Sequence, residues 1–395
     1  MKERISAFIE SHRDEWISVS KQIWNNPELG NQEFEAMKLL TGLLEQYGFN
    51  VERKVAGLAT AFRAEFDSGV PGPTIAYLAE YDALAGLGHA CGHNIIGVMS
   101  STAAIALKET GAVQAGKVVV FGTPAEETNG AKVPMAEQGF FDGVDAAMMA
   151  HPYKAYERSG SSMAIEALQF SYHGKSAHAA ANPQDGINAL DSVLQLFSSV
   201  NALRQHVTPD VRIHGIISHG GIAPNVVPDF AQAQFYVRAA EKATVRLVAD
   251  KVRRAGEAAA AAMGCTLEIS NYELSYDNMI TNQTLSGLFT DNIIAMGVDP
   301  SEIQSGLDHG SLDLGNVSHI VPAVHPYVRV PDCPYDLHTH EFREAVGGDR
   351  GMSALLFGAA ALARTGSDLF ADPALLQAVQ QEFVRHKAAS STTST

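Results

Sequence analysis

The spacing of apolar residues predicts helices at the start of the chain, followed by strands that alternate with helices. Residues 1–48 carry apolar side chains at helical spacing, which predicts two helices joined through Asn26-Pro27. Strands are expected at 59–66, 74–79, 117–123 and 144–151, and a helix at about 95–108. Two of these strands, KVVVFGT and VDAAMMAH, are continuously apolar, which is typical of strands buried on both faces. The alternation predicts a mainly parallel sheet covered by helices on both sides.

The pattern changes near residue 162 and predicts a second, smaller domain. The segments SMAIEALQFSYHG and DFAQAQFYVRA alternate in period two, while 185–203 and 242–263 read as helices. Strands at VRIHGIISHG and TLEISNYE complete the order β-α-β-β-α-β. This order, with one polar sheet face, is typical of a ferredoxin-like α+β unit.

The smaller unit reads as an insertion. We expect it at 165–276, because the sequence beyond 280 returns to helices and short apolar strands and ends in a long Ala/Leu helix at 350–364. The larger α/β domain, with its mainly parallel sheet, would then comprise 1–164 and 277–395.

Composition and charge narrow the class of protein. The 395 residues are 46% hydrophobic and 18% charged, a globular balance. The formal net charge of −16 argues against nucleic acid and anionic membranes as partners. No apolar run is long enough to span a membrane, and the N-terminus does not resemble a secretory signal. Three cysteines leave at least one thiol free, so we expect a cytoplasmic location.

Side chains that can bind metal ions follow three of the predicted strands. They lie in His89-Ala90-Cys91-Gly92-His93-Asn94, in Pro124-Ala125-Glu126-Glu127 and in Met149-Ala150-His151-Pro152. A thiolate and an imidazole two residues apart can converge on one ion. Of two adjacent carboxylates, one can bind a metal while the other moves a proton. Because sites in open α/β sheets lie at the carboxyl ends of strands, all three segments are expected at one site.

Each signal also has an ordinary explanation. A lone cysteine is often a small core residue, a Glu-Glu pair is often a solvated loop, and a buried histidine often only forms hydrogen bonds. The hypothesis of a metal site depends on the occurrence of all these residue types at corresponding strand ends.

Several strings along nearly the whole chain carry a family resemblance. They are NPELGNQEFEA, EYDALAGLGHACGHN, GTPAEETNGAK, MMAHP, HGKSAHAAANPQDGINALDSV, GGIAPNVVPD, FYVRA and DLHTHEF, in this order. The chain resembles the aminoacylase/carboxypeptidase family of metallohydrolases, peptidase family M20. It is most similar to the branch of hippurate hydrolase, indoleacetyl-amino-acid hydrolases and aminobenzoyl-glutamate hydrolase-like dipeptidases. The resemblance implies a catalytic α/β domain with an inserted ferredoxin-like lid through which two copies form a homodimer.

The resemblance also implies individual roles. The ligands of two divalent metal ions would be Cys91, His93, Glu127, His151 and His338. His338 is preferred to His340 because it follows the Leu of the family's Leu-His pattern. Glu126 would be the general base, and a lid histidine of the partner subunit, matched by His178, would stabilise the oxyanion.

Further residues are expected in supporting roles, Arg238 and Asn225 because they match the family and Asp82 because it lies near the site. Arg238 and Asn225 would hold a substrate carboxylate, and Asp82 could orient a ligand histidine, although a structural loop role is an alternative. Asn94 replaces the Asp that often follows Cys-Gly-His, and Ala85 replaces a Pro; neither departure removes an implied ligand. Thiolate, imidazole and carboxylate ligands favour zinc, with manganese, cobalt or nickel as alternatives.

The sequence therefore predicts a metal-dependent hydrolase that cleaves an amide bond in N-acyl amino acids, amino-acid conjugates or dipeptides. Two alternatives stand beside it. One is a cysteine-nucleophile hydrolase that uses Cys91 with His93 or His89, and the other is a non-catalytic binding protein on the same scaffold. The stretch GLDHGSLDLGNVS also resembles the family, where it shapes the rim of the active site, but no chemistry is assigned to Asp308, Ser311 or Asp313.

Overall fold

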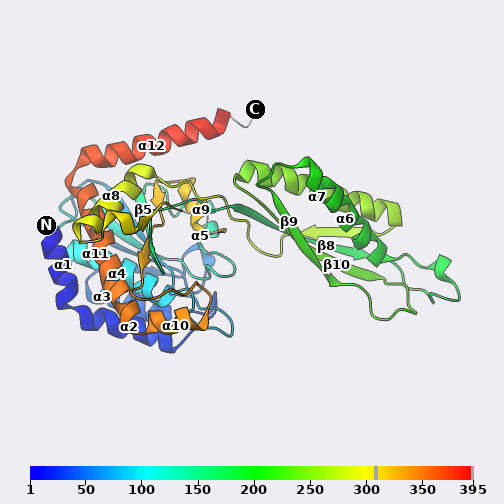
Figure 1. Cartoon of the computed structure of the whole chain (residues 1–395), viewed down its shortest axis with the longest axis horizontal. Coiled ribbons are helices and arrows are strands. Elements are labelled where there is room, and N and C mark those ends of the chain that lie inside the picture. Colours follow the sequence, from blue (N-terminus) through cyan, green and yellow to red (C-terminus); the bar gives the residue numbers. More distant parts are fainter. Residues whose placement is uncertain (307–309, 393–395) are drawn as a thin grey trace. The chain divides into compact units, whose positions relative to one another are not determined.

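The chain divides into two units in a computed structural model that describes residues 1–306 and 310–392 (Figure 1). Unit 1 combines Met1–Ser161 with Met279–Thr395, and unit 2 comprises Ser162–Asn278. Asp308, from the expected rim segment, lies outside the described residues.

Unit 1 is built on a six-stranded sheet with the strand order β1-β2-β4-β3-β5-β13. The strands are β1 (Asn50–Arg53), β2 (Phe62–Asp67), β3 (Thr74–Ala79), β4 (Lys117–Gly122), β5 (Ala146–Met148) and β13 (Ala323–Val324). β4, β3, β5 and β13 run parallel; at one edge β2 pairs antiparallel with β4, and β1 pairs antiparallel with β2. The predicted α/β class with a mainly parallel sheet is confirmed.

The N-terminal region forms three helices rather than the two that were predicted. They are α1 (Lys2–Ser11), α2 (Arg13–Asn25) and α3 (Phe34–Gln46), so the junction near Asn26-Pro27 is present but a second break occurs at His12. The ring of His12 hydrogen-bonds the carbonyl of Phe8 at 3.0 Å, and its backbone leaves the helical region. The apolar spacing runs across this break, which explains why the pattern did not indicate it.

Helix α4 (His93–Glu109) is the central helix of unit 1. It is buried along almost its whole length and packs against β3 and α11 (Asp349–Ala371). The other helices of the unit are α5 (Lys132–Glu137), α8 (Gln283–Ala295), α9 (Leu314–Ser318), α10 (His340–Gly347) and α12 (Pro373–Thr392). None of the helices in the described part of the chain has the length and apolar character needed to cross a membrane.

Unit 1 also contains a small second sheet, which was not predicted and which begins at His151. Its strands, in the order β12-β7-β14-β6, are Ile303–Gln304, Tyr156–Glu157, Tyr327–Arg329 and His151–Tyr153. Strands of two or three residues carry no recognisable period, so an apolar pattern cannot reveal them.

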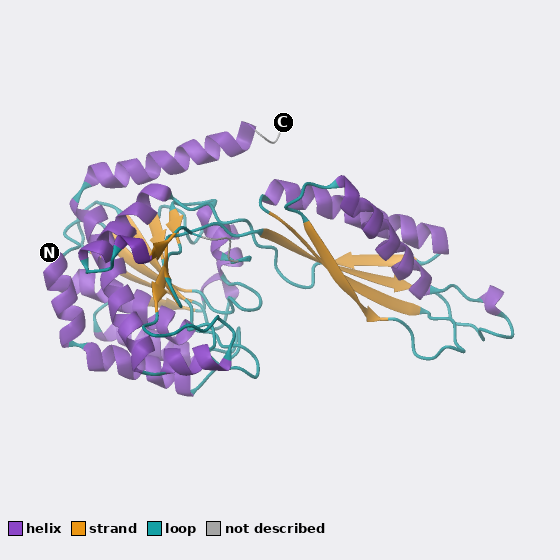
Figure 2. Ribbon diagram, viewed as in Figure 1, coloured by secondary structure: helices purple, strands orange, loops and turns teal. Residues whose placement is uncertain are grey.

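Unit 2 has the inserted α+β architecture that the sequence predicted. Its elements are β8 (Ala164–His173), α6 (Ala189–Leu203), β9 (Arg212–His219), β10 (Phe230–Ala239), α7 (Lys242–Met263) and β11 (Thr266–Ser270). The four strands form an antiparallel sheet in the order β11-β8-β10-β9, and both helices lie along one face of it (Figure 2). Residues of β10 alternate between buried and half-buried, because one face packs on the helices and the other does not.

Candidate metal centre

The carboxyl ends of three parallel strands bring the candidate ligands to one edge of the six-stranded sheet. β3 is followed by Glu80 and Asp82, β4 by the Glu126-Glu127 pair, and β5 by His151. Open α/β sheets usually bind substrates and cofactors at the edge formed by the carboxyl ends of their parallel strands.

A glycine sets the positions of Cys91 and His93 at the start of α4. Gly92 has a φ of +86°, and a Cβ at this position would lie 2.5 Å from Cγ of Pro152. Neither the backbone conformation nor the space admits a larger residue. The chain therefore turns sharply here, and both flanking side chains enter the same buried region, where Cys91 and His93 are 7% and 1% exposed.

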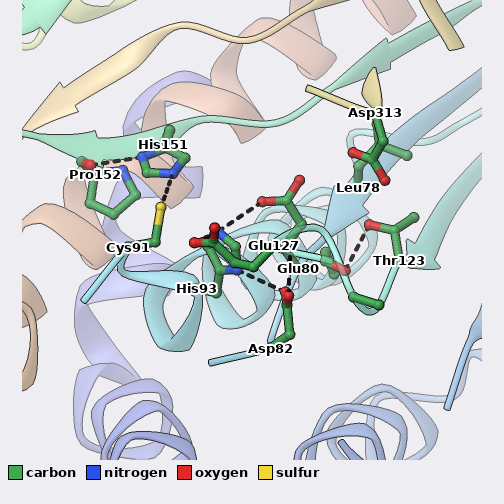
Figure 3. A network of polar contacts seen from close by, with 12 residues as sticks. Leu78, Glu80, Asp82, Cys91, His93, Thr123, Glu127, His151, Pro152 and Asp313 are labelled. Carbon is green, nitrogen blue, oxygen red and sulfur yellow. Dashed lines mark hydrogen bonds and ion pairs between the residues drawn. The ribbon is translucent and has the colours of Figure 1, made fainter. Parts of the chain in front are cut away.

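Donor atoms from the five candidate ligands converge in this region. The atoms of Cys91, His93 and His151 lie within 4.8 Å of one another, and so do those of Cys91, Glu127 and His338. Sγ of Cys91 is 3.4 Å from Nε2 of His151. Cys91 belongs to both groups. Figure 3 shows Cys91, His93, Glu127 and His151 turned toward one another.

Hydrogen bonds orient both buried histidines. Nδ1 of His93 donates to Oδ1 of Asp82 at 2.8 Å, and Nδ1 of His151 donates to the carbonyl of Pro152 at 2.8 Å. Each bond leaves the Nε2 lone pair directed at the other ligands, the arrangement expected for metal-binding imidazoles. Asp82 also accepts the backbone N–H of Glu127 at 2.9 Å, so one carboxylate orients two candidate ligands.

His338 joins the group from the C-terminal segment of unit 1, Met279–Thr395. Its Nε2 lies 3.3 Å from Oε1 of Glu127, and its backbone N–H donates to the carbonyl of Ala90 at 2.9 Å. The residue adopts a left-handed conformation with φ of 61°, uncommon for a residue with a side chain. His340 is the exposed first residue of α10 and belongs to no donor group in the described part of the chain.

The two adjacent glutamates differ in their electrostatic environment. Burial raises the pKa of Glu126 well above its usual value, and the neighbouring carboxylates of Glu80 and Glu127 add to this. Burial also favours the neutral form of Glu127, but its contacts with His338 and His93 outweigh this and lower its pKa to about 2. Paired carboxyl groups whose pKa values are pushed apart are typical of acid–base sites.

A cavity of about 260 Å³ opens at these side chains. Its lining residues are Glu80, Cys91, Glu126, Glu127, His151, Ser311, Leu312, His325, Tyr327, Leu337 and His338. The cavity thus places the two glutamates beside a space large enough for part of a small substrate.

Three further predicted residues lie in unit 2. Nδ1 of His178, an exposed residue, accepts backbone hydrogen bonds from Ala180 and Ala181, both at 3.2 Å. The backbone carbonyl of Asn225, also exposed, accepts the N–H of Ala179 at 3.1 Å. Arg238 lies on β10, with its guanidinium 5.3 Å from the ring centre of Tyr236.

Sequence reasoning missed the buried partners of this site. Lys132 is fully buried and bonds both Glu80 and Asp313, and Glu33 is fully buried against the loop before Glu126. Lys132 stands in the string GTPAEETNGAK that carried the resemblance, but a single lysine in a loop usually reads as exposed.

The geometry does not favour a cysteine nucleophile. Burial raises the pKa of Cys91 well above that of an ordinary thiol. A nucleophilic cysteine needs a lowered pKa, because the thiolate is the reactive form. Cys91 is therefore better suited to bind a metal ion, which removes the thiol proton on binding.

Comparisons with known proteins agree with this description. Residues 162–263 match the family model of the peptidase dimerisation domain. The chain is 37% identical to the Xaa-Arg dipeptidase of Mus musculus over 97% of this chain and 92% of that protein. It is 36% identical to a subunit of the p-aminobenzoyl-glutamate hydrolase of Escherichia coli, over 70% of this chain and 61% of that protein.

A solved structure from Bacillus subtilis, described as a dinuclear metal-binding peptidase of the M20 family, has the same fold. It superposes with a TM-score of 0.63 at 20% identity and covers 89% of this chain and 98% of that one. Because the mouse relative is 37% identical over almost the full length, the chain belongs to the M20 family of peptidases and is a hydrolase of amide or peptide bonds.

Proposed function

We propose that the chain is a metal-dependent hydrolase that releases a free amino acid from a dipeptide or an N-acyl amino acid, with Glu126 as the general base. The observation that carries the proposal is the convergence of five donor side chains, Glu127 among them, beside Glu126, whose pKa is shifted in the opposite direction to that of Glu127.

The donor set fits two divalent ions. Nε2 of His93 is deeply buried and makes no hydrogen bond within the described part of the chain, which is costly for an imidazole unless a cation takes its lone pair. In this proposal Cys91, His93 and His151 hold one ion and Cys91, Glu127 and His338 hold the other. Thiolate and imidazole favour zinc, while manganese, cobalt and nickel bind the same ligand types.

The residues of the chain divide the chemistry between them. When bound, the ions supply a Lewis acid that polarises the scissile carbonyl and lowers the pKa of water. Glu126 accepts a proton from the attacking water and returns it to the departing amine. Its raised pKa suits the second step, because a carboxyl group that retains its proton near neutral pH can donate it.

His178 is the proposed donor to the oxyanion, supplied by the partner subunit. Because Nδ1 of His178 accepts two backbone hydrogen bonds, the ring proton resides on Nε2 in the neutral tautomer. The backbone therefore fixes the ring as a donor at its outer nitrogen. Such preorganised donors stabilise the charge that develops on the carbonyl oxygen.

Arg238 and Asn225 are the proposed contacts to the substrate carboxylate. The planar guanidinium of Arg238 can form two parallel hydrogen bonds to a carboxylate. Dipeptides with a C-terminal arginine and p-aminobenzoyl-glutamate are the first substrates to test, because relatives of the chain are named for them.

We also propose a homodimer formed through unit 2. β9 is an edge strand of its sheet and exposes Ile216 (60%) and Ile217 (42%). A second copy of such an edge can pair with it and cover the apolar side chains. Ile216→Lys should yield a monomer by light scattering, while Val384→Lys on exposed α12 should not; a dimeric Ile216→Lys protein would contradict the interface.

A cytoplasmic location is supported by the thiols. All three cysteines, Cys91, Cys265 and Cys333, are free, as expected in a reducing compartment. Cell fractionation would test this, and recovery outside the cytoplasm would contradict it.

The substitution Glu126→Gln tests the catalytic proposal. It should reduce kcat by about 10²–10⁴-fold, the usual contribution of a general base, while two metal ions per chain remain bound. Glu137→Gln, the same change on the exposed end of α5, is the control and should leave kcat unchanged. Wild-type turnover by Glu126→Gln, or by metal-free protein, would contradict the proposal.

A further inference from the structure

Lys132 forms a fully buried ion network beside the candidate metal centre. Its Nζ is 2.6 Å from Oε1 of Glu80 and 2.6 Å from Oδ1 of Asp313. The backbone N–H of Lys132 donates to the other oxygen of Asp313 at 3.2 Å. A buried lysine is rare and costly, and this one lies near a site expected to hold cations.

The second oxygen of Glu80 points to the metal ligands. Oε2 lies 3.5 Å from Nε2 of His93, and the side chain is only 3% exposed (Figure 3). Glu80 also lines the same cavity as Cys91 and His151. Nε2 of His93 itself is buried and forms no hydrogen bond to any residue that the structure describes, so both atoms face the same space.

The separation of these two atoms matches that of two ligands on one ion. With metal–ligand bonds of about 2.0–2.1 Å in a tetrahedral arrangement, two donor atoms lie about 3.3–3.4 Å apart. The group of Cys91, His93 and His151 contains one anionic donor, whereas the group with Glu127 and His338 contains two. A carboxylate beside His93 removes this asymmetry.

We propose that Glu80 is a further metal ligand, at the subsite formed by Cys91, His93 and His151, and that Lys132 is the positioning residue that aims it. Lys132 holds Oε1 and leaves only Oε2 to face the ion. Asp313 accepts a second hydrogen bond from the ammonium group of Lys132 and so helps to hold this group on the side of Glu80 that faces away from the proposed ligands. The inference rests on the proposed function, because it assumes that this subsite binds a metal.

The substitution Glu80→Gln tests the inference by metal binding rather than activity. Zinc affinity, measured by competition with a chelator, should fall at least about tenfold at one of the two sites and stay unchanged at the other. The melting temperature of the metal-free protein should change little, because the amide oxygen of the new side chain can still accept from Lys132 and Asp313 still balances its charge.

Two further variants make the test specific. Glu382→Gln makes the same change at a buried carboxylate that accepts hydrogen bonds from Gln283 and Thr284, and should leave both zinc affinities unchanged. Glu80→Asp keeps the charge but withdraws the carboxylate from His93, and should also weaken one site.

The outcomes separate this inference from the proposed function. Two ions bound by the wild type, and two bound with equal affinity by folded Glu80→Gln, would overturn the role of Glu80 alone. A destabilised metal-free Glu80→Gln protein that retains both affinities would also overturn it, in favour of a purely structural network. A wild-type chain that binds no divalent ion would overturn the proposed function as well.

Discussion

Unit 1 buries charged side chains near the carboxyl ends of the parallel strands of its main sheet, whereas the charged side chains of unit 2 are exposed or half-buried. Glu80, Asp82, Lys132 and Asp313 are all buried, but no charged residue is buried among residues 162–278. A buried charge costs free energy unless it is paired, and apolar residues of similar size would often give a core that is equally stable. The contrast therefore distinguishes a region of unit 1 that maintains buried charge from the interior of unit 2, which is held together by apolar packing.

The largest expected effect comes from removing the buried cation of unit 1. Lys132→Met leaves the carboxylates of Glu80 and Asp313 buried without their shared partner, which should cost about 3–5 kcal/mol of unfolding free energy. Urea denaturation measures the loss. Lys117→Met, at a partly exposed lysine that pairs with Glu65 and Asp67, should cost less than about 1 kcal/mol. Equal losses would refute the contrast.

The apolar counterpart of this experiment is Phe235→Ala in unit 2. Phe235 is fully buried and lies between the rings of Phe170 and Phe197, with ring centres 6.1 and 4.7 Å away. Removal of a buried phenylalanine costs about 3–5 kcal/mol. Metal binding, however, should stay at the wild-type level because the proposed ligands lie in unit 1. The exposed Ile222→Ala serves as the control, and loss of metal by folded Phe235→Ala would show that the units are not independent.

The buried carboxyl group of Glu33 in unit 1 should make the free energy of unfolding depend on pH. Glu33 is fully buried and accepts hydrogen bonds from Thr60 and from the N–H of Ala125, both at 2.8 Å. Burial is the main cause that raises the pKa of Glu33 to about 7 from 4.5. Between these pH values the folded state binds more protons than the unfolded state, so stability falls as pH rises, by about 3 kcal/mol in all.

Glu33→Gln should abolish this part of the pH dependence. Unfolding free energies measured at pH 5 and pH 8 should differ less in the variant than in the wild type. Glu52→Gln on exposed β1 should behave like the wild type. An unchanged difference in Glu33→Gln would show that the carboxyl group is ionised throughout this range.

The smallest expected effects concern two helix caps, one in each unit. Thr339 accepts the N–H of Phe342 at the start of α10, and Asn188 accepts the N–H of Leu190 at the start of α6. Replacing either by Ala should cost about 1 kcal/mol of unfolding free energy. Only Thr339→Ala should also weaken metal binding, because it adjoins His338. Chelator competition compares the two, and an equal effect on zinc affinity would count against the role of His338.

The sequence predicted well the helices and strands in which apolar residues recur at a regular spacing, and it predicted very short strands poorly. The expected helix at 242–263 coincides with α7, and the buried strand KVVVFGT became β4. The small sheet of β6, β7, β12 and β14 was missed because its strands span two or three residues each. The break between α1 and α2 was missed because the apolar spacing continues through it.

The candidate site shows the same division. Glu127 and His151 could be expected to meet because each follows a parallel strand, and Cys91 could be expected near them because it lies in the loop between β3 and α4. The network of Lys132 could not be foreseen, because its partner Asp313 lies 181 residues away and no local pattern joins them. His338 depended on the family resemblance alone, since its left-handed backbone follows no helix or strand signal.

Unit 2 is continuous along the chain, whereas unit 1 is interrupted by it. During synthesis the ribosome therefore completes all of unit 2 before it adds β13, which extends the main sheet, and His338. Domains generally fold as units as they emerge. The segment Met1–Ser161 must consequently wait until unit 2 and the chain as far as His338 have been made before its sheet and its proposed ligand set are complete. Metal capture would then be one of the last steps in the maturation of the protein.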